Sequence, residues 1–203
     1  MKKTVKYIFL GLCAFSIILG SFIYYSQSDR ENVIIERISE HSEEVKYYSE
    51  LNGIDPRVYI SIVYGELSSN LNFFDEFDDI RADFGYDPSV GFGQMRVSTF
   101  MWIEHKYADG VHIIKSNNTE ELVAKIKDDV TNIAYTTFYV GLIEKKIRNE
   151  LNIEPSVKLL GSYYSLGIDH GKRKINPDFT SPVGEAAEEF FYSDKLLNQY
   201  LRK

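Results

Sequence analysis

Apolar residues recur every three or four positions over most of the chain, the spacing that predicts amphipathic helices. Many of these segments also carry helix boundary residues, such as a capping side chain, a proline in the first turn or a glycine after the last. No segment has a convincing strand pattern, so we expect a mainly α-helical protein. The pattern predicts helices over residues 28–51, 55–66, 98–103, 118–126, 133–147, 159–166 and 181–197.

The first 25 residues form a separate segment. Lys2, Lys3 and Lys6 precede an uncharged run from Ile8 to Tyr25, which as a helix would be roughly 27 Å long, close to the thickness of a bilayer core. The lysines predict a cytoplasmic N-terminus with the remainder outside. A cleaved signal peptide is the alternative, although it needs small residues that the run lacks at its end. We therefore expect an anchor over 1–25, a polar stalk or linker helix over 26–44 and a compact domain over 45–203.

Composition narrows the class of protein further. Among the 203 residues, 44% are hydrophobic and 26% charged, which fits one globular domain with an appendage. The only cysteine, Cys13, lies inside the apolar run, so an exported domain would have to be stable without disulfides. The net charge of −7 and the lack of a basic stripe make nucleic acid an unexpected partner.

One carboxylate lies on the apolar face of a predicted helix. Tyr59, Ile62 and Val63 precede Glu66 by seven, four and three positions, so all four side chains share a face. Burial would raise the pKa of this carboxyl group, as a general acid near neutral pH requires. A solvated residue in the last helical turn is the alternative.

Four motifs follow one another along the chain. They are Glu66 at a helix end, Ser89-Val90-Gly91-Phe92-Gly93-Gln94-Met95 with Thr99, Asn132-Ile133 with Tyr139, and Tyr163-Tyr164-Ser165-Leu166-Gly167. Together they resemble the lytic transglycosylase and goose-type lysozyme superfamily, over roughly residues 45–170. Four departures from the family pattern are Leu67 after the glutamate, Thr136 in place of glycine, Val140 in place of leucine, and Ser165 in place of asparagine.

The resemblance implies a lysozyme-like fold and cleavage of peptidoglycan between N-acetylmuramic acid and N-acetylglucosamine, without a metal or other cofactor. Glu66 would act as acid and then base, and the muramic acid's own 6-hydroxyl would attack to leave a 1,6-anhydro product. A hydrolase instead needs a second carboxylate to activate water. The resemblance makes Asp87 our candidate for it, because it stands four residues before Gly91, as an aspartate does in goose-type lysozymes. A turn aspartate before Pro88 is the alternative, and Asp79 and Asp83 are weaker candidates.

The same resemblance implies a set of substrate-binding residues. Gln94 would hydrogen-bond a sugar acetamide or brace its own turn, and Tyr164 would direct its hydroxyl toward Glu66. Tyr139 is expected to be structural, and the acidic segment 73–87 to be a solvated or substrate-facing loop. The expected substrate-binding residues are Ser89, Gln94, Met95, Tyr164 and Ser165.

These expectations place the protein on the outer face of a bacterial cytoplasmic membrane, with peptidoglycan glycan strands as substrate. Two other classes stay open. One is a glycan-binding or envelope-scaffold protein that has kept the fold without activity. The other is a component of a secretion, conjugation or sporulation apparatus, recruited by a partner.

Overall fold

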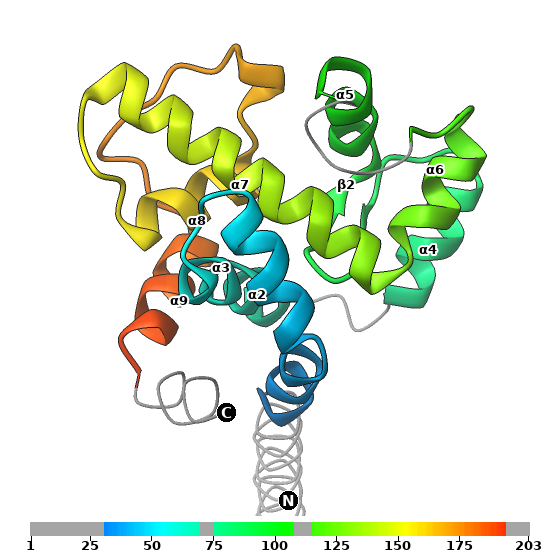
Figure 1. Ribbon diagram of the computed structural model, residues 1–203, viewed down its shortest axis with the longest axis horizontal. Helices are drawn as coiled ribbons and strands as arrows, with labels where there is room; N and C mark the ends of the chain where they lie inside the picture. Colours follow the sequence, from blue (N-terminus) through cyan, green and yellow to red (C-terminus); the bar gives the residue numbers. More distant parts are fainter. Residues whose placement is uncertain (1–30, 70–74, 108–114, 194–203) are drawn as a thin grey trace, which may run out of the picture. The chain divides into compact units, whose positions relative to one another are not determined.

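The computed structural model describes residues 31–69, 75–107 and 115–193, and these residues are mainly helical, as predicted (Figure 1). Residues 31–40 form a first helical segment. The elements that follow are α2 (Ser42–Leu51), α3 (Pro56–Ser69), α4 (Asp75–Asp83), β1 (Ser89–Val90), β2 (Met95–Arg96), α5 (Val97–Tyr107), α6 (Thr119–Ile126), α7 (Asp129–Leu151), α8 (Val157–Leu166), the short 3₁₀ helix η2 (Asp169–Gly171) and α9 (Pro182–Phe191).

Helix α7 runs through the middle of the compact part of the chain (Figure 1). Helices α2, α3, α8 and α9 gather along one part of it, while α4, α5, α6 and the β1–β2 hairpin gather around its N-terminal end. Ile133, Val140, Ile143 and Ile147 of α7 are fully buried, so this helix supplies much of the core. The burial of apolar side chains from both groups against α7 stabilises the fold.

Several helix boundaries confirm the capping residues read from the sequence. Helix α2 ends at Asn52, and Gly53 follows with a φ of +73°, a left-handed conformation that glycine adopts without strain. The Asp55 carboxylate accepts a hydrogen bond from the Arg57 backbone N–H at 2.9 Å at the start of α3. Asn118 and Ser181 cap α6 and α9 in the same way.

The structure corrects four of the predicted elements. The helix expected over 28–51 is interrupted at His41, whose φ and ψ of −108° and 22° are not helical. The expected acidic loop 73–87 contains α4, which packs against β1 and α6. Two short antiparallel strands are present, with Ser89 opposite Arg96. They were not predicted, because two residues are too few to show an alternating pattern.

The fourth correction concerns the start of α5. The predicted range places the start of this helix at Ser98, but the helix begins one residue earlier, at Val97. The capping acceptor is the Asp87 carboxylate, which receives the Ser98 backbone N–H at 2.7 Å and the Ser98 hydroxyl at 2.8 Å. A side chain eleven positions away therefore takes the role that a local cap was expected to fill.

Contacts divide the chain into a unit over Met1–Arg37 and a compact unit over Ile38–Lys203. The compact unit thus begins earlier than the expected boundary at Val45, and Ile38 is fully buried. The predicted anchor, residues 1–25, lies outside the described residues. Among the described helices, none combines the length and the apolar character needed to cross a membrane.

Candidate functional site

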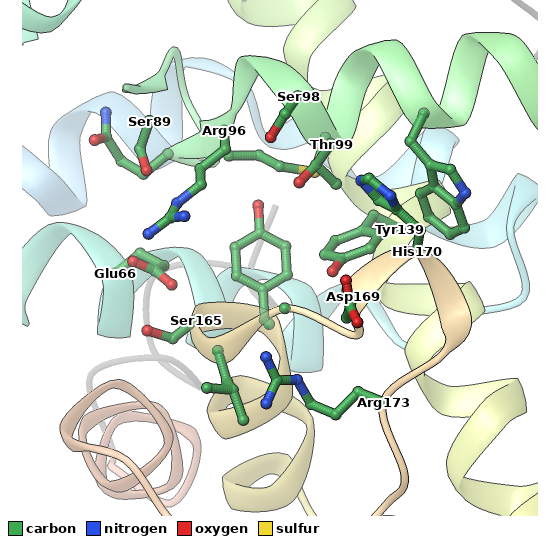
Figure 2. Close-up of a pocket in the computed structure, with 16 residues that line it drawn as sticks. Glu66, Ser89, Arg96, Ser98, Thr99, Tyr139, Ser165, Asp169, His170 and Arg173 are labelled. Carbon is green, nitrogen blue, oxygen red and sulfur yellow. The ribbon is translucent and has the colours of Figure 1, made fainter. Parts of the chain in front are cut away.

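A groove of about 490 Å³ lies between the β1–β2 hairpin and α5 on one side and α3, α8 and the segment after α8 on the other (Figure 2). Glu66 lines it, and so do all five residues predicted to bind substrate. The groove residues, in chain order, are Glu66, Ser89, Gln94, Met95, Arg96, Ser98, Thr99, Trp102, Tyr139, Tyr164, Ser165, Leu166, Gly167, Asp169, His170 and Arg173.

Glu66 is a half-buried carboxyl group near the C-terminal end of α3. Burial raises its pKa to about 7, because the protein solvates the charged form less well than water does. A hydrogen bond from the Ser165 hydroxyl acts in the opposite direction and lowers this pKa. The group is therefore protonated in a large fraction of molecules near neutral pH, which suits a general acid.

Close helix packing fixes the part of α3 that carries Glu66. A side chain at the preceding residue, Gly65, would lie only 2.5 Å from the Val183 carbonyl oxygen of α9. At the residue before Gly65, the rings of Tyr64 and Phe190 stack with their centroids 3.9 Å apart. Because α9 holds α3 at short range, the Glu66 carboxyl has a defined position in the groove.

A clamp centred on Asn132 holds the turn between β1 and β2. The Asn132 side-chain oxygen accepts the Gly93 N–H at 2.8 Å, and its amide nitrogen donates to the carbonyls of Val90 at 3.1 Å and Ile126 at 2.9 Å. A Cβ at Gly91 would lie 2.0 Å from that nitrogen. The glycine of the second motif and the asparagine of the third are thus in direct contact.

Gln94 is the residue after Gly93, and its side chain supports the same turn. Its side-chain amide donates to the Gly91 carbonyl at 2.9 Å, its φ is +51°, and it is 5% exposed. The sequence left open whether Gln94 contacts a sugar or supports its own turn. The structure shows the second role, and because Gln94 also lines the groove, the first stays a prediction.

The Tyr164 hydroxyl does not have the predicted partner. It donates to the Gly93 carbonyl at 2.6 Å, so Tyr164 connects α8 to the turn. Burial raises the pKa of this phenol, which keeps it a neutral hydrogen-bond donor. The next residue, Ser165, is the one that hydrogen-bonds to Glu66. The position where this chain departs from the family's asparagine is therefore the one in contact with the candidate acid.

Tyr139 of α7 supports the segment that follows α8, as expected of a structural residue. Its hydroxyl accepts the Ile168 N–H at 3.1 Å, and burial raises its pKa to about 12. Its ring also lines the groove, so the structural role does not remove it from the site.

Asp87 is not among the groove residues. Its side chain is exposed, and both carboxylate oxygens accept hydrogen bonds from Ser98 at the start of α5. A helix N-terminus presents unpaired N–H groups that a carboxylate satisfies well, which explains this use of the residue. Of the two weaker candidates, Asp83 pairs with Lys127 at 2.7 Å, and neither Asp83 nor Asp79 lines the groove.

Five further groove residues belong to none of the predicted motifs: Arg96, Trp102, Asp169, His170 and Arg173. Trp102 stacks on His170 with the ring centroids 5.4 Å apart. Asp169 and His170 have φ values of +46° and +52°, so a tight turn brings both to the groove. The segment has no periodic pattern, and only the resemblance of its neighbours to a known motif could have drawn attention to it.

Among the described residues, no group of three or more His, Cys, Asp or Glu side chains is arranged to hold a metal ion. Comparisons of the chain with protein-family models, with curated proteins and with solved structures find no match. The motifs and the geometry of the groove are therefore the features that point to a function.

Proposed function

We propose that this protein is a lytic transglycosylase with a lysozyme-like domain, which cleaves the β-1,4 bond between N-acetylmuramic acid and N-acetylglucosamine in peptidoglycan. One observation carries the proposal: Glu66, with a pKa raised to about 7, lines a groove together with the residues of the second and fourth motifs. A raised pKa alone would be a weak argument, because structural carboxylates can also have one.

In the proposed reaction the Glu66 carboxyl donates its proton to the glycosidic oxygen as the bond from that oxygen to the muramic acid C1 breaks. The resulting carboxylate then takes the proton of the 6-hydroxyl on the same muramic acid, and O6 forms the new bond to C1. No water is consumed, and Glu66 ends protonated as it began. A carboxyl group with a pKa near 7 suits both steps of the reaction, since it gives up a proton and takes one back at small free-energy cost.

Asp87 was expected to distinguish a hydrolase from a transglycosylase. Its position as the cap of α5 removes support for a hydrolase that pairs it with Glu66. Asp169 favours a second candidate function, because it is a carboxylate that lines the same groove (Figure 2). In that muramidase, Asp169 would activate a water molecule for attack on C1 while Glu66 protonates the leaving oxygen.

The test is product analysis with the full-length chain in mild detergent, incubated with purified peptidoglycan. Mass spectrometry of the soluble muropeptides should give 1,6-anhydro ends, whereas reducing ends would establish the muramidase. Glu66→Gln keeps the shape of the side chain but cannot donate the proton, so release should fall at least about 100-fold.

Two controls make the result interpretable. Asp87→Asn should retain activity once its folding has been verified, and Asp169→Asn should retain it only in a transglycosylase. Undiminished activity in Glu66→Gln would overturn the proposal. Binding to peptidoglycan with no release of product from the wild-type chain would point instead to the glycan-binding or scaffold class.

A further inference from the structure

Two arginines that line the groove have no acidic partner within residues 31–69, 75–107 and 115–193. Arg96 extends from β2 and Arg173 from the segment after η2, and in the view of Figure 2 they reach in from opposite sides with Glu66 and Ser165 between them. Among the described residues, no carboxylate lies within ion-pairing distance of either guanidinium. The groove therefore presents two positive charges that the folded chain does not neutralise itself.

Three arginines in the helices of the compact unit are paired instead. Arg57 pairs with Asp55, Arg81 with Asp78, and Arg148 with Glu144. The chain as a whole carries a net charge of −7, with 30 acidic residues available as partners. Two unpaired arginines in one groove of such an acidic protein suggest that their partner belongs to a ligand.

The side chain of Arg173 gives a second, independent indication that the partner belongs to a ligand. Its side-chain Nε is buried and has no hydrogen-bond acceptor among the described residues. A buried donor without an acceptor destabilises the fold, so native structures rarely keep one that no ligand or solvent satisfies. The Arg173 backbone N–H donates to the Ile168 carbonyl at 3.1 Å, which fixes the segment that presents the side chain.

Guanidinium groups are well suited to bind carboxylates. Their planar N–H donors match the two carboxylate oxygens, and a charge-assisted hydrogen bond is stronger than a neutral one. Of the two sugars in peptidoglycan, N-acetylglucosamine is uncharged, while N-acetylmuramic acid carries a lactyl group and, on it, a peptide stem with free carboxylates. A carboxylate on a bound glycan strand therefore belongs to its muramic acid residue.

We propose that Arg96 and Arg173 bind the carboxylates carried by the muramic acid side chain, on the peptide stem or on the lactyl group where the stem has been removed. This inference rests on the proposed function of the groove as a peptidoglycan site. Glu66 and Asp169 are the acidic groups of the same groove, and they oppose a free anion. The arginines would offset that repulsion and let the groove select muramic acid strands over neutral polymers of N-acetylglucosamine.

The experiment measures binding of the full-length chain in mild detergent, at low ionic strength, with Glu66→Gln as background so that strands are not cut. Sedimentation is compared on three forms of peptidoglycan: intact, stripped of stems by an amidase, and carbodiimide-treated with ammonia to convert carboxyls into neutral amides. Arg173→Gln should weaken binding to intact peptidoglycan about tenfold, and Arg96→Gln about threefold because its side chain is exposed.

Amidated, neutral peptidoglycan distinguishes recognition of carboxylates by the two arginines from a structural role of their side chains. The chain that keeps both arginines should bind amidated peptidoglycan as weakly as the arginine variants bind native peptidoglycan. The variants themselves should bind the amidated form no more weakly than the native form. Arg173→Lys should recover part of the affinity, since it restores the charge. Arg148→Gln, an equal change of charge on the outside of α7, should bind normally. Stem-stripped strands show whether the lactyl carboxylate alone is sufficient.

The outcomes separate this inference from the enzymatic proposal. Equal losses on native and amidated peptidoglycan, or no loss in either variant, would overturn the inference while leaving cleavage by Glu66 untouched. Arginine-dependent binding together with an inactive wild-type chain would support the inference and overturn the transglycosylase. Failure of the wild-type chain to bind any of the three forms would overturn the inference directly.

Discussion

At the scale of single residues, the pKa of Glu66 results from two opposing influences. Burial raises it to about 7, and the hydrogen bond from Ser165 lowers it by stabilising the carboxylate. The family motif has asparagine at position 165, so this chain uses a hydroxyl where its resemblance implies an amide. Serine at this position places a small hydrogen-bond donor against the acid.

Ser165 should therefore set the pH dependence of the reaction. A general acid works in its protonated form, so kcat/KM should fall as the pH rises through about 7. Ser165→Ala removes a hydrogen bond to the charged form, which raises the Glu66 pKa and moves this fall to higher pH by about one pH unit. Ser165→Thr keeps a hydroxyl and should keep the profile. The pH dependence of muropeptide release measures both, and a shift to lower pH in Ser165→Ala would contradict the assignment.

At the scale of elements, three glycines allow α3, α8 and α9 to approach closely. Cβ atoms built at Gly65, Gly161 and Gly184 would lie 2.5, 3.1 and 2.1 Å from the nearest atoms of a neighbouring helix. Two of these helices, α3 and α8, carry Glu66 and Ser165, so the close approach aligns the acid with its hydrogen-bond donor. The sequence showed these glycines but not their partners, because helix neighbours far apart in the chain have no local signature.

Gly184→Ala should therefore destabilise the protein. The new methyl group would lie 2.3 Å from the Lys158 carbonyl oxygen, a backbone atom that cannot turn aside, and the cost should be about 2 kcal/mol or more. Gly141→Ala is the matched control within α7, since its methyl group meets nothing closer than 3.4 Å. It should raise stability by about 0.5 kcal/mol through helix propensity. Urea denaturation measures both, and equal effects would contradict this account of the packing.

At the scale of the whole molecule, the compact unit begins at Ile38 and not at Val45. The polar composition of residues 30–44 suggested a stalk, because few of its side chains are apolar. Ile38 is nevertheless fully buried, and α2 begins at Ser42. A mean composition over fifteen residues does not show that two of its isoleucines, Ile34 and Ile38, are buried, which is why a stalk was expected as far as Glu44.

Two truncations test that boundary. A chain beginning at Ile38 should unfold in a single cooperative thermal transition, followed by circular dichroism. A chain beginning at Val45 loses the Ile38 side chain and the first turn of α2, and it should be less stable by about 3 kcal/mol. Equal stability of the two chains would show that Ile38 does not belong to the compact unit.

The sequence by itself determined the helical class, several helix ends and those motif residues that line the groove. Caps, prolines and glycines act within a few positions, and so they can be read from the chain. Only the tertiary structure decided that Ser165 contacts Glu66, that Tyr164 donates to Gly93, and that Asp87 caps α5 and does not line the groove. It also brought Arg96 and Arg173 to the groove that holds Glu66. These relations depend on segments distant in sequence meeting in the folded chain, which no local pattern encodes.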